Sequence, residues 1–145
     1  MKKRILTVLI ALITVLTLCF TLAGCDKSGS IKKAFEDEGY TVTTVDTNNE
    51  TAKSLLKTLF TKEQIEKIGE YEIILCVGEG LGAFTGTGMV IKFPSEGEIK
   101  NFLTVEDADG NKDTKLYDSA KENGSINGNC LYLGAPKGLE IFKNA

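Results

Sequence analysis

The sequence predicts a single small α+β domain with an antiparallel sheet, preceded by a secretory signal. Apolar residues recur at helical spacing, most clearly over residues 52–60, which predicts amphipathic helices. Short apolar or β-branched runs such as 40–45 and 89–93, bounded by glycine or proline, predict strands. About 120 residues remain behind the signal, which suits one domain with its own core.

The first part of the domain predicts helix, strand and helix. Residues 31–35 place apolar side chains at helical spacing before Gly39, a residue type that commonly ends a helix. Residues 40–45 are rich in β-branched side chains and predict a strand. Residues 52–60 then repeat the i, i+3, i+4, i+7 pattern of a helix with one buried face.

A short helix and an apolar strand follow. Thr61 and Gln64 have the spacing of a capping box, in which each side chain satisfies an orphan backbone N–H, so we expect a helix over 62–68. Residues 71–77 predict a strand that is apolar on both faces from Ile73 onward.

The second half repeats this alternation. Residues 89–93 predict a strand ended by Pro94, and Ser95 with Glu98 forms a second capping box that opens a helix. A polar loop comes after this helix and leads into a further helix.

Three elements complete the chain. Residues 116–120 have helical spacing and end near Asn123 and Gly124, and residues 130–133 predict the last strand. Pro136 suits the first turn of a final helix.

Without the two terminal helices, the order is β-α-β-β-α-β, the split arrangement of ferredoxin-like folds. In that topology the second and fourth strands lie at opposite edges of the sheet, about 14 Å apart. An edge strand with one covered face should alternate, yet residues 73–77 are continuously apolar. We therefore expect either that the N-terminal helix covers the second face of this strand, or that the strand order differs.

The N-terminus has the layout of a secretory signal. Residues 1–4 carry three positive charges, and residues 5–20 are almost wholly apolar or small. A retained membrane helix is the alternative, because residues 5–23 are long enough to span a bilayer.

The run Leu22-Ala23-Gly24-Cys25 resembles the lipobox of bacterial lipoproteins. The resemblance implies a diacylglycerol on Cys25, cleavage between Gly24 and Cys25, and anchoring at the extracytoplasmic face of the cell membrane. In diderm bacteria, Asp26 resembles a signal for retention in the inner membrane. We thus expect a signal at 1–24, a lipidated cysteine and tether at 25–30, and one domain at 31–145.

Composition narrows the function classes. Removal of the signal takes Lys2, Lys3 and Arg4 from the 17 basic residues and leaves 14 against 20 acidic residues. The resulting side-chain charge of −6 disfavours nucleic-acid binding, which needs a basic surface. Histidine is absent, and the only arginine lies in the signal, which removes imidazole catalysis and guanidinium clamps. No cofactor is indicated.

A glycine-rich segment follows the 71–77 strand. Residues 78–83 satisfy the G-x-G-x-x-A spacing of a dinucleotide fingerprint, but a Thr- and Gly-rich run and a strand follow where a helix is required. A hairpin connection is the favoured interpretation, with a ligand loop as the alternative. The glycines are Gly78, Gly80, Gly82, Gly86 and Gly88.

A polar loop resembles a calcium loop of the EF-hand kind. Oxygen-bearing side chains alternate, but Lys112 stands where the sharp turn wants glycine, so a solvated turn is favoured. The candidate ligands are Asp107, Asp109, Asn111, Asp113 and Asp118.

Two cysteines remain after Cys19 leaves with the signal and Cys25 is lipidated. Cys76 and Cys130 each lie in an apolar run, so a buried free thiol is favoured over a disulfide. The ferredoxin-like arrangement and the disulfide are competing predictions, because about 14 Å exceeds the Cα separation of about 7 Å that a disulfide tolerates.

These observations predict a lipid-anchored extracytoplasmic binding protein without catalytic activity, whose partner is another envelope protein or a small ligand. The alternatives are an envelope enzyme that uses lysine or carboxylate chemistry and a module stabilised by calcium.

Overall fold

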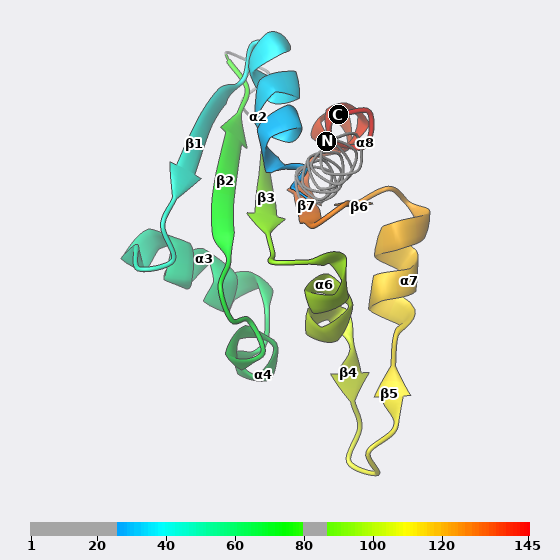
Figure 1. Ribbon diagram of the computed structural model, residues 1–145. Helices are drawn as coiled ribbons and strands as arrows, with labels where there is room; N and C mark the ends of the chain where they lie inside the picture. Colours follow the sequence, from blue (N-terminus) through cyan, green and yellow to red (C-terminus); the bar gives the residue numbers. More distant parts are fainter. Residues whose placement is uncertain (1–25, 80–86) are drawn as a thin grey trace, which may run out of the picture.

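The computed structural model describes residues 26–79 and 87–145. Within these residues, helices cover both faces of a five-stranded antiparallel sheet (Figure 1). The predicted α+β class and the antiparallel sheet are confirmed.

The elements follow the predicted order closely. The described helices are α2 Ser28–Asp37, α3 Glu50–Leu59, α4 Lys62–Glu66, α6 Glu96–Leu103, α7 Lys115–Glu122 and α8 Pro136–Lys143. The described strands are β1 Thr41–Val45, β2 Glu72–Val77, β3 Gly88–Lys92, β4 Val105–Glu106, β5 Lys112–Asp113, β6 Ile126–Asn127 and β7 Cys130–Gly134.

The order of the strands in space is β1-β2-β3-β7-β6, with every neighbouring pair antiparallel. The ferredoxin-like arrangement, which would place β2 at an edge, is therefore wrong. The reason lies in β2 itself, because Ile73, Ile74 and Cys76 are fully buried and need cover on both faces of the sheet. Helix layers on the two sides of the sheet provide that cover, while β1 and β3 pair with the two edges of β2.

One face of the sheet, here called the α2 face, packs against α2 and α8. The buried residues of this layer are Ile31, Phe35, Tyr40, Ile74, Cys76, Val90, Cys130, Tyr132 and Phe142. The helix that precedes β1 thus covers the second face of β2, as one of the two sequence alternatives requires. Figure 1 shows α2 and α8 side by side over the strands.

The opposite face, here called the α6 face, packs against α3, α4, α6 and α7. Its buried residues are Ala52, Leu56, Ile73, Met89, Ile91, Phe93, Ile99, Phe102, Leu103 and Leu131. Alternate side chains of each inner strand point to the two faces, so β2, β3 and β7 contribute to both cores.

The predicted tether at 25–30 is wrong for the residues that the structure describes. Helix α2 begins at Ser28, which is only 6% exposed, and Ile31 is fully buried. Residues 28–30 therefore belong to the folded domain, together with Asp26 and Lys27, which bind Lys92 and Asn129. Residues 26–30 have the composition of a linker because they are small or polar, but Asp26 binds Lys92 and the backbone of Lys27 binds Asn129.

Local capping follows the sequence. Thr61 and Gln64 form the predicted reciprocal capping box at α4, and Ser95 accepts a hydrogen bond from the backbone N–H of Glu98 at α6. Gly39 and Gly124 follow α2 and α7 with φ values of 81° and 83°, a region in which glycine carries no steric penalty.

Candidate functional site

Four charged side chains gather where the α2 face meets one end of the sheet. Glu72 and Lys92 lie directly opposite each other on β2 and β3. The Nζ of Lys92 lies 2.8 Å from the carboxylate of Asp26, and the Nζ of Lys32 lies 2.9 Å from that of Glu72. We call these four residues the charged cluster. Its two ion pairs close the end of the core beside Cys130.

Asp26 is held at several points. Its Oδ1 accepts hydrogen bonds from the backbone N–H of Ser28 at 2.9 Å and from the Ser28 hydroxyl at 2.7 Å. Burial alone would raise the pKa of Asp26, but the hydrogen bonds from Lys92 and Ser28, together with the charge of Lys92, lower it to about 2. Asp26 is therefore ionised throughout the physiological pH range.

The next residue is fixed as well. The backbone N–H of Lys27 donates to Oδ1 of Asn129 at 3.1 Å, and Nδ2 of Asn129 donates to the carbonyl of Phe93 at 2.9 Å. Asn129 is only 5% exposed, so this amide joins the segment before α2 to the ends of β3 and β7 from within the protein.

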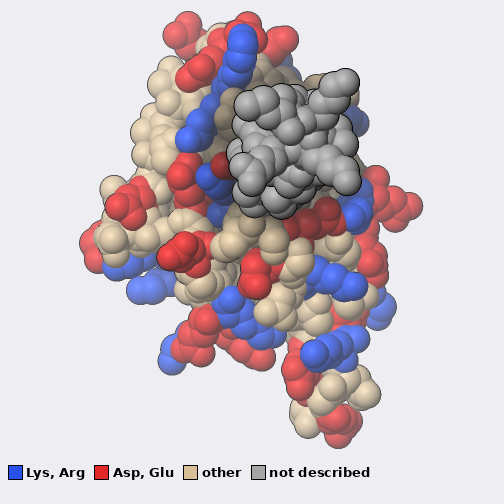
Figure 2. Space-filling view, viewed as in Figure 1, with Lys and Arg blue, Asp and Glu red and all other residues tan. Residues whose placement is uncertain are grey.

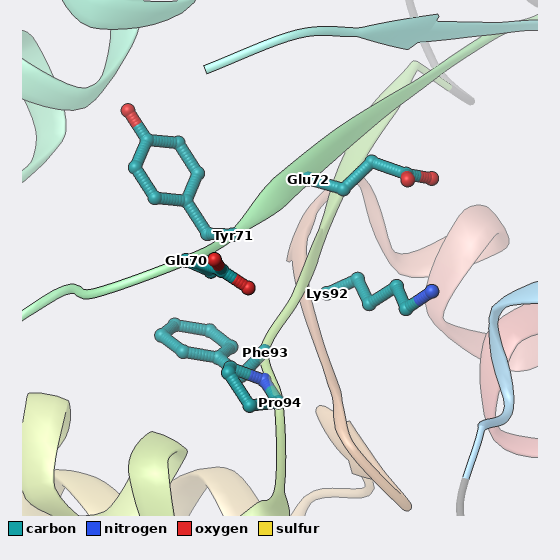
Figure 3. Close-up of a pocket in the computed structure, with 6 residues that line it drawn as sticks. All are labelled: Glu70, Tyr71, Glu72, Lys92, Phe93 and Pro94. Carbon is teal, nitrogen blue, oxygen red and sulfur yellow. The ribbon is translucent and has the colours of Figure 1, made fainter.

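A pocket of about 240 Å³ adjoins the charged cluster. Its lining residues are Glu70, Tyr71, Glu72, Lys92, Phe93 and Pro94. Figure 3 shows Glu72 and Lys92 extending to one side of the strands, while Tyr71 and Phe93 lie on the other. Two of the three charged side chains that line the pocket, Glu72 and Lys92, are already ion-paired within the protein.

An apolar groove of about 390 Å³ lies on the α6 face. Leu131 and Leu133 of β7 contribute to its lining, as do Leu59 of α3 and Leu116 of α7. Leu59 is 54% exposed, although the helical pattern predicts it on a buried face, and Leu116 is 53% exposed. The groove therefore presents aliphatic side chains to solvent.

The glycine-rich segment is only partly described. Gly80, Gly82 and Gly86 lie outside the described residues. Gly78 and Gly88 lie at the two ends of the connection between the antiparallel strands β2 and β3, which confirms the hairpin interpretation.

Gly88 has a packing role in β3. A Cβ atom at this position would lie 2.4 Å from the Tyr132 ring, so glycine is needed for the ring to lie across the strand. The hydroxyl of Tyr132 donates to the carbonyl of Ala135 at 2.8 Å, which holds the ring there.

The predicted calcium ligands are engaged elsewhere. Asp107 caps the turn between β4 and β5 by accepting from the backbone N–H groups of Asp109 and Asn111, at 2.9 and 2.8 Å. Asp113 accepts from the backbone N–H of Lys115, and Asp118 accepts from the hydroxyl of Thr114. Within residues 26–79 and 87–145, no group of three or more carboxylate, cysteine or histidine side chains could hold a metal ion. The segment is a β-hairpin closed by a polar turn, as the favoured interpretation expects.

The two thiols are free and buried, so the disulfide alternative is wrong. Cys76 pairs with Gly88 and Cys130 with Lys92, at opposite ends of β3, which separates the thiols by about 14 Å along the strands and about 10 Å across them. Burial raises the pKa of each thiol to about 12. Neither is a thiolate near neutral pH.

Cys25 and Gly24, the predicted lipidation and cleavage positions, lie outside the described residues. Among the helices that the structure does describe, none has the length and apolar character needed to cross a membrane.

The charged cluster and the groove were not predicted from the sequence. One signal for the cluster was present, because Glu72 and Lys92 each lie at the end of an otherwise apolar strand.

Comparison with known proteins found no matching family model, no matching curated protein and no matching solved structure.

Proposed function

We propose that the protein is a bacterial membrane lipoprotein, anchored through Cys25 at the extracytoplasmic face, whose domain binds another envelope protein without catalysing a reaction. The observation that carries the anchor is the run Leu22-Ala23-Gly24-Cys25 behind a basic and apolar leader. Two acyl chains on Cys25 would give stable attachment, because each buried methylene contributes about 0.8 kcal/mol.

The start of the fold supports this assignment. Cleavage between Gly24 and Cys25 would leave every described element in the mature chain, since each of them lies after residue 25.

The apolar groove supports the binding role. Exposed aliphatic side chains on α3 and α7 flank a floor of β7 leucines, which suits apolar side chains of a protein partner. We propose the groove as the partner-binding surface.

The described titratable groups support a role other than catalysis. Burial raises the pKa of both thiols, which keeps them in the unreactive protonated form near neutral pH. The four residues of the charged cluster are paired with one another in two ion pairs. The lack of histidine throughout the chain points in the same direction.

Metabolic labelling with a palmitate analogue tests the anchor. We expect the wild-type protein to incorporate the label and Cys25→Ala to lose both the label and membrane fractionation. Unchanged labelling of the Cys25→Ala variant would contradict the proposal.

Site-specific photocrosslinking in intact cells tests the binding surface. A crosslinker at Leu59 or at Leu116 should capture the same envelope protein, because both residues flank the groove. Val105, which is 44% exposed on β4, is the matched control and should not capture it. Equal capture at all three positions, or none at the groove, would contradict a partner bound there.

A further inference from the structure

We propose that two copies of the chain pair antiparallel through strand β1, edge to edge, so that their two sheets join into one. The pairing uses neither the proposed lipid anchor nor the apolar groove. It rests on a difference between the two edges of the sheet and on the sequence of β1, which is complementary to itself.

The two edges of the sheet are built differently. The β6 edge is two residues long, and Nδ2 of Asn127 within it donates to the carbonyl of Phe142 in α8 at 3.0 Å. The β1 edge is five residues long, and all of them pair with β2 in one unbroken register. Among residues 26–79 and 87–145, no strand and no backbone hydrogen bond occupies the other side of β1. Figure 1 accordingly shows β1 at the outer border of the sheet.

Strand β1 lacks the features that usually keep an edge strand from pairing. Alternate backbone N–H and C=O groups of such a strand point outward, where a further strand can bond them. Charged side chains, proline and bulges commonly block this pairing, but residues 41–45 are threonine and valine throughout. The three threonines are exposed. Figure 2 shows an uncharged surface at the upper left of the view, where β1 lies in Figure 1.

A second copy of β1 fits this edge. When two copies are aligned antiparallel about Thr43, every residue of the strand is paired. Thr43 faces the partner's Thr43, and each valine of the strand, Val42 and Val45, faces a threonine. All of these pairs join β-branched side chains, which stabilise neighbouring strands. The arrangement has twofold symmetry, so both copies use the same surface and the contact closes on itself.

Charge selects this register. Acidic residues flank the strand, with Glu38 before it and Asp46 directly after it. In the register centred on Thr43, Asp46 faces a tyrosine and Glu38 faces an asparagine, so no two acids meet. Slipping the strands in one direction brings Glu38 opposite Asp46, and slipping them in the other direction shortens the pairing to residues 43–45.

Disulfide trapping in cells tests the pairing. The full-length chain is expressed as Thr43→Cys or as Thr41→Cys, and the cells are treated with copper phenanthroline. Directly opposed residues have Cα atoms about 5 Å apart, within the range of a disulfide, whereas the two copies of position 41 are about 13 Å apart along the strands. Thr41→Cys is the matched control, because both positions are exposed threonines of the same strand.

We expect Thr43→Cys to form severalfold more disulfide-linked dimer than Thr41→Cys on non-reducing gels. The wild-type chain gives the background from its own cysteines, of which Cys76 and Cys130 are buried. Equal amounts of dimer from the two variants would overturn the pairing. A disulfide from Thr43→Cys to a different protein alone would also overturn it and assign the edge to that protein.

A charge exchange at the same position separates pairing from folding. Two copies with different affinity tags are co-expressed, and their co-purification is measured after detergent extraction. Thr43→Lys in both copies, or Thr43→Glu in both, places like charges directly opposite each other and should reduce co-purification severalfold. One copy of each variant should restore it. Equal co-purification in all combinations, or no recovery in the mixed pair, would overturn the pairing.

Discussion

The two faces of the sheet are built differently. The α2 face buries tyrosine and cysteine side chains and is closed at one end by the charged cluster and at the other by the Tyr132 ring over Gly88. The α6 face buries aliphatic and phenylalanine side chains and leaves a groove flanked by exposed leucines. The contrast indicates that one face fixes the segment before α2, whereas the other leaves apolar side chains exposed to solvent.

The largest effects should come from the aromatic centres of the two faces. Phe102 on the α6 face and Phe35 on the α2 face are almost wholly buried, and each packs against two other aromatic rings. Phe102→Ala and Phe35→Ala should each lower the free energy of unfolding by about 3–5 kcal/mol, measured by urea unfolding of the chain from residue 25 with Cys25→Ser. A loss well below this range for one variant alone would mean that its face is not a packed core.

A smaller loss should follow overpacking at Gly88. Alanine there would collide with the Tyr132 ring at 2.4 Å and disturb its hydrogen bond to Ala135, for a loss of about 1–3 kcal/mol. Gly69→Ala is the control, because nothing lies within 4 Å of its added Cβ. Equal stabilities for the two variants would show that the ring does not close this end of the α2 face.

The Asp26 ion pair should contribute a pH-dependent increment. The pKa of Asp26 is about 2 in the fold against 3.8 for an ordinary aspartate, so its contribution is present above about pH 4 and is lost as the pH falls toward 2. Because the carboxylate is about half exposed, solvent screening reduces this contribution to about 1 kcal/mol. Urea unfolding between pH 2 and 6 should show a shallower pH dependence for Asp26→Asn than for the wild type. Parallel curves would contradict a stabilising contact between Asp26 and Lys92.

The groove leucines should matter little for folding. Leu59→Ser with Leu116→Ser should change the free energy of unfolding by about 0.5 kcal/mol or less per site, because both side chains are more than half exposed. The same pair should lose crosslinking to the envelope partner from a third groove position, Ser119. A large loss of stability would instead assign these leucines to the core.

Calcium should not change the thermal stability of the protein. The carboxylates of the β4–β5 hairpin are engaged in turn and helix-end hydrogen bonds, so millimolar calcium should leave the melting temperature unchanged. A clear rise in thermal denaturation scans would show a ligand selective for the folded state.

Much of the secondary structure was predictable because it depends on residues that are close together in the sequence. The capping residues Thr61 and Ser95 and the helix-terminating glycines Gly39 and Gly124 mark their helix ends in the sequence and in the structure. Strand order was not predictable, because it depends on pairing between distant segments. The apolar run of β2 carried the decisive hint, since a strand buried on both faces belongs inside a sheet.

The site was less predictable than the fold. The charged cluster joins residues from 26 to 92 through tertiary contacts alone, and no local pattern specifies them. Residues 26–30 have the composition of a linker, so their hydrogen bonds to one another and to Asn129 reversed the expectation of a tether. Helical spacing also could not reveal that Leu59 and Leu116 stay exposed.

Tandem mass spectrometry of the N-terminal tryptic peptide from membrane-extracted protein tests the central claim most directly. The account predicts a mature chain that begins at Cys25 and carries a diacylglyceryl group on its sulfur. A chain that begins elsewhere, or an unmodified Cys25, would contradict it.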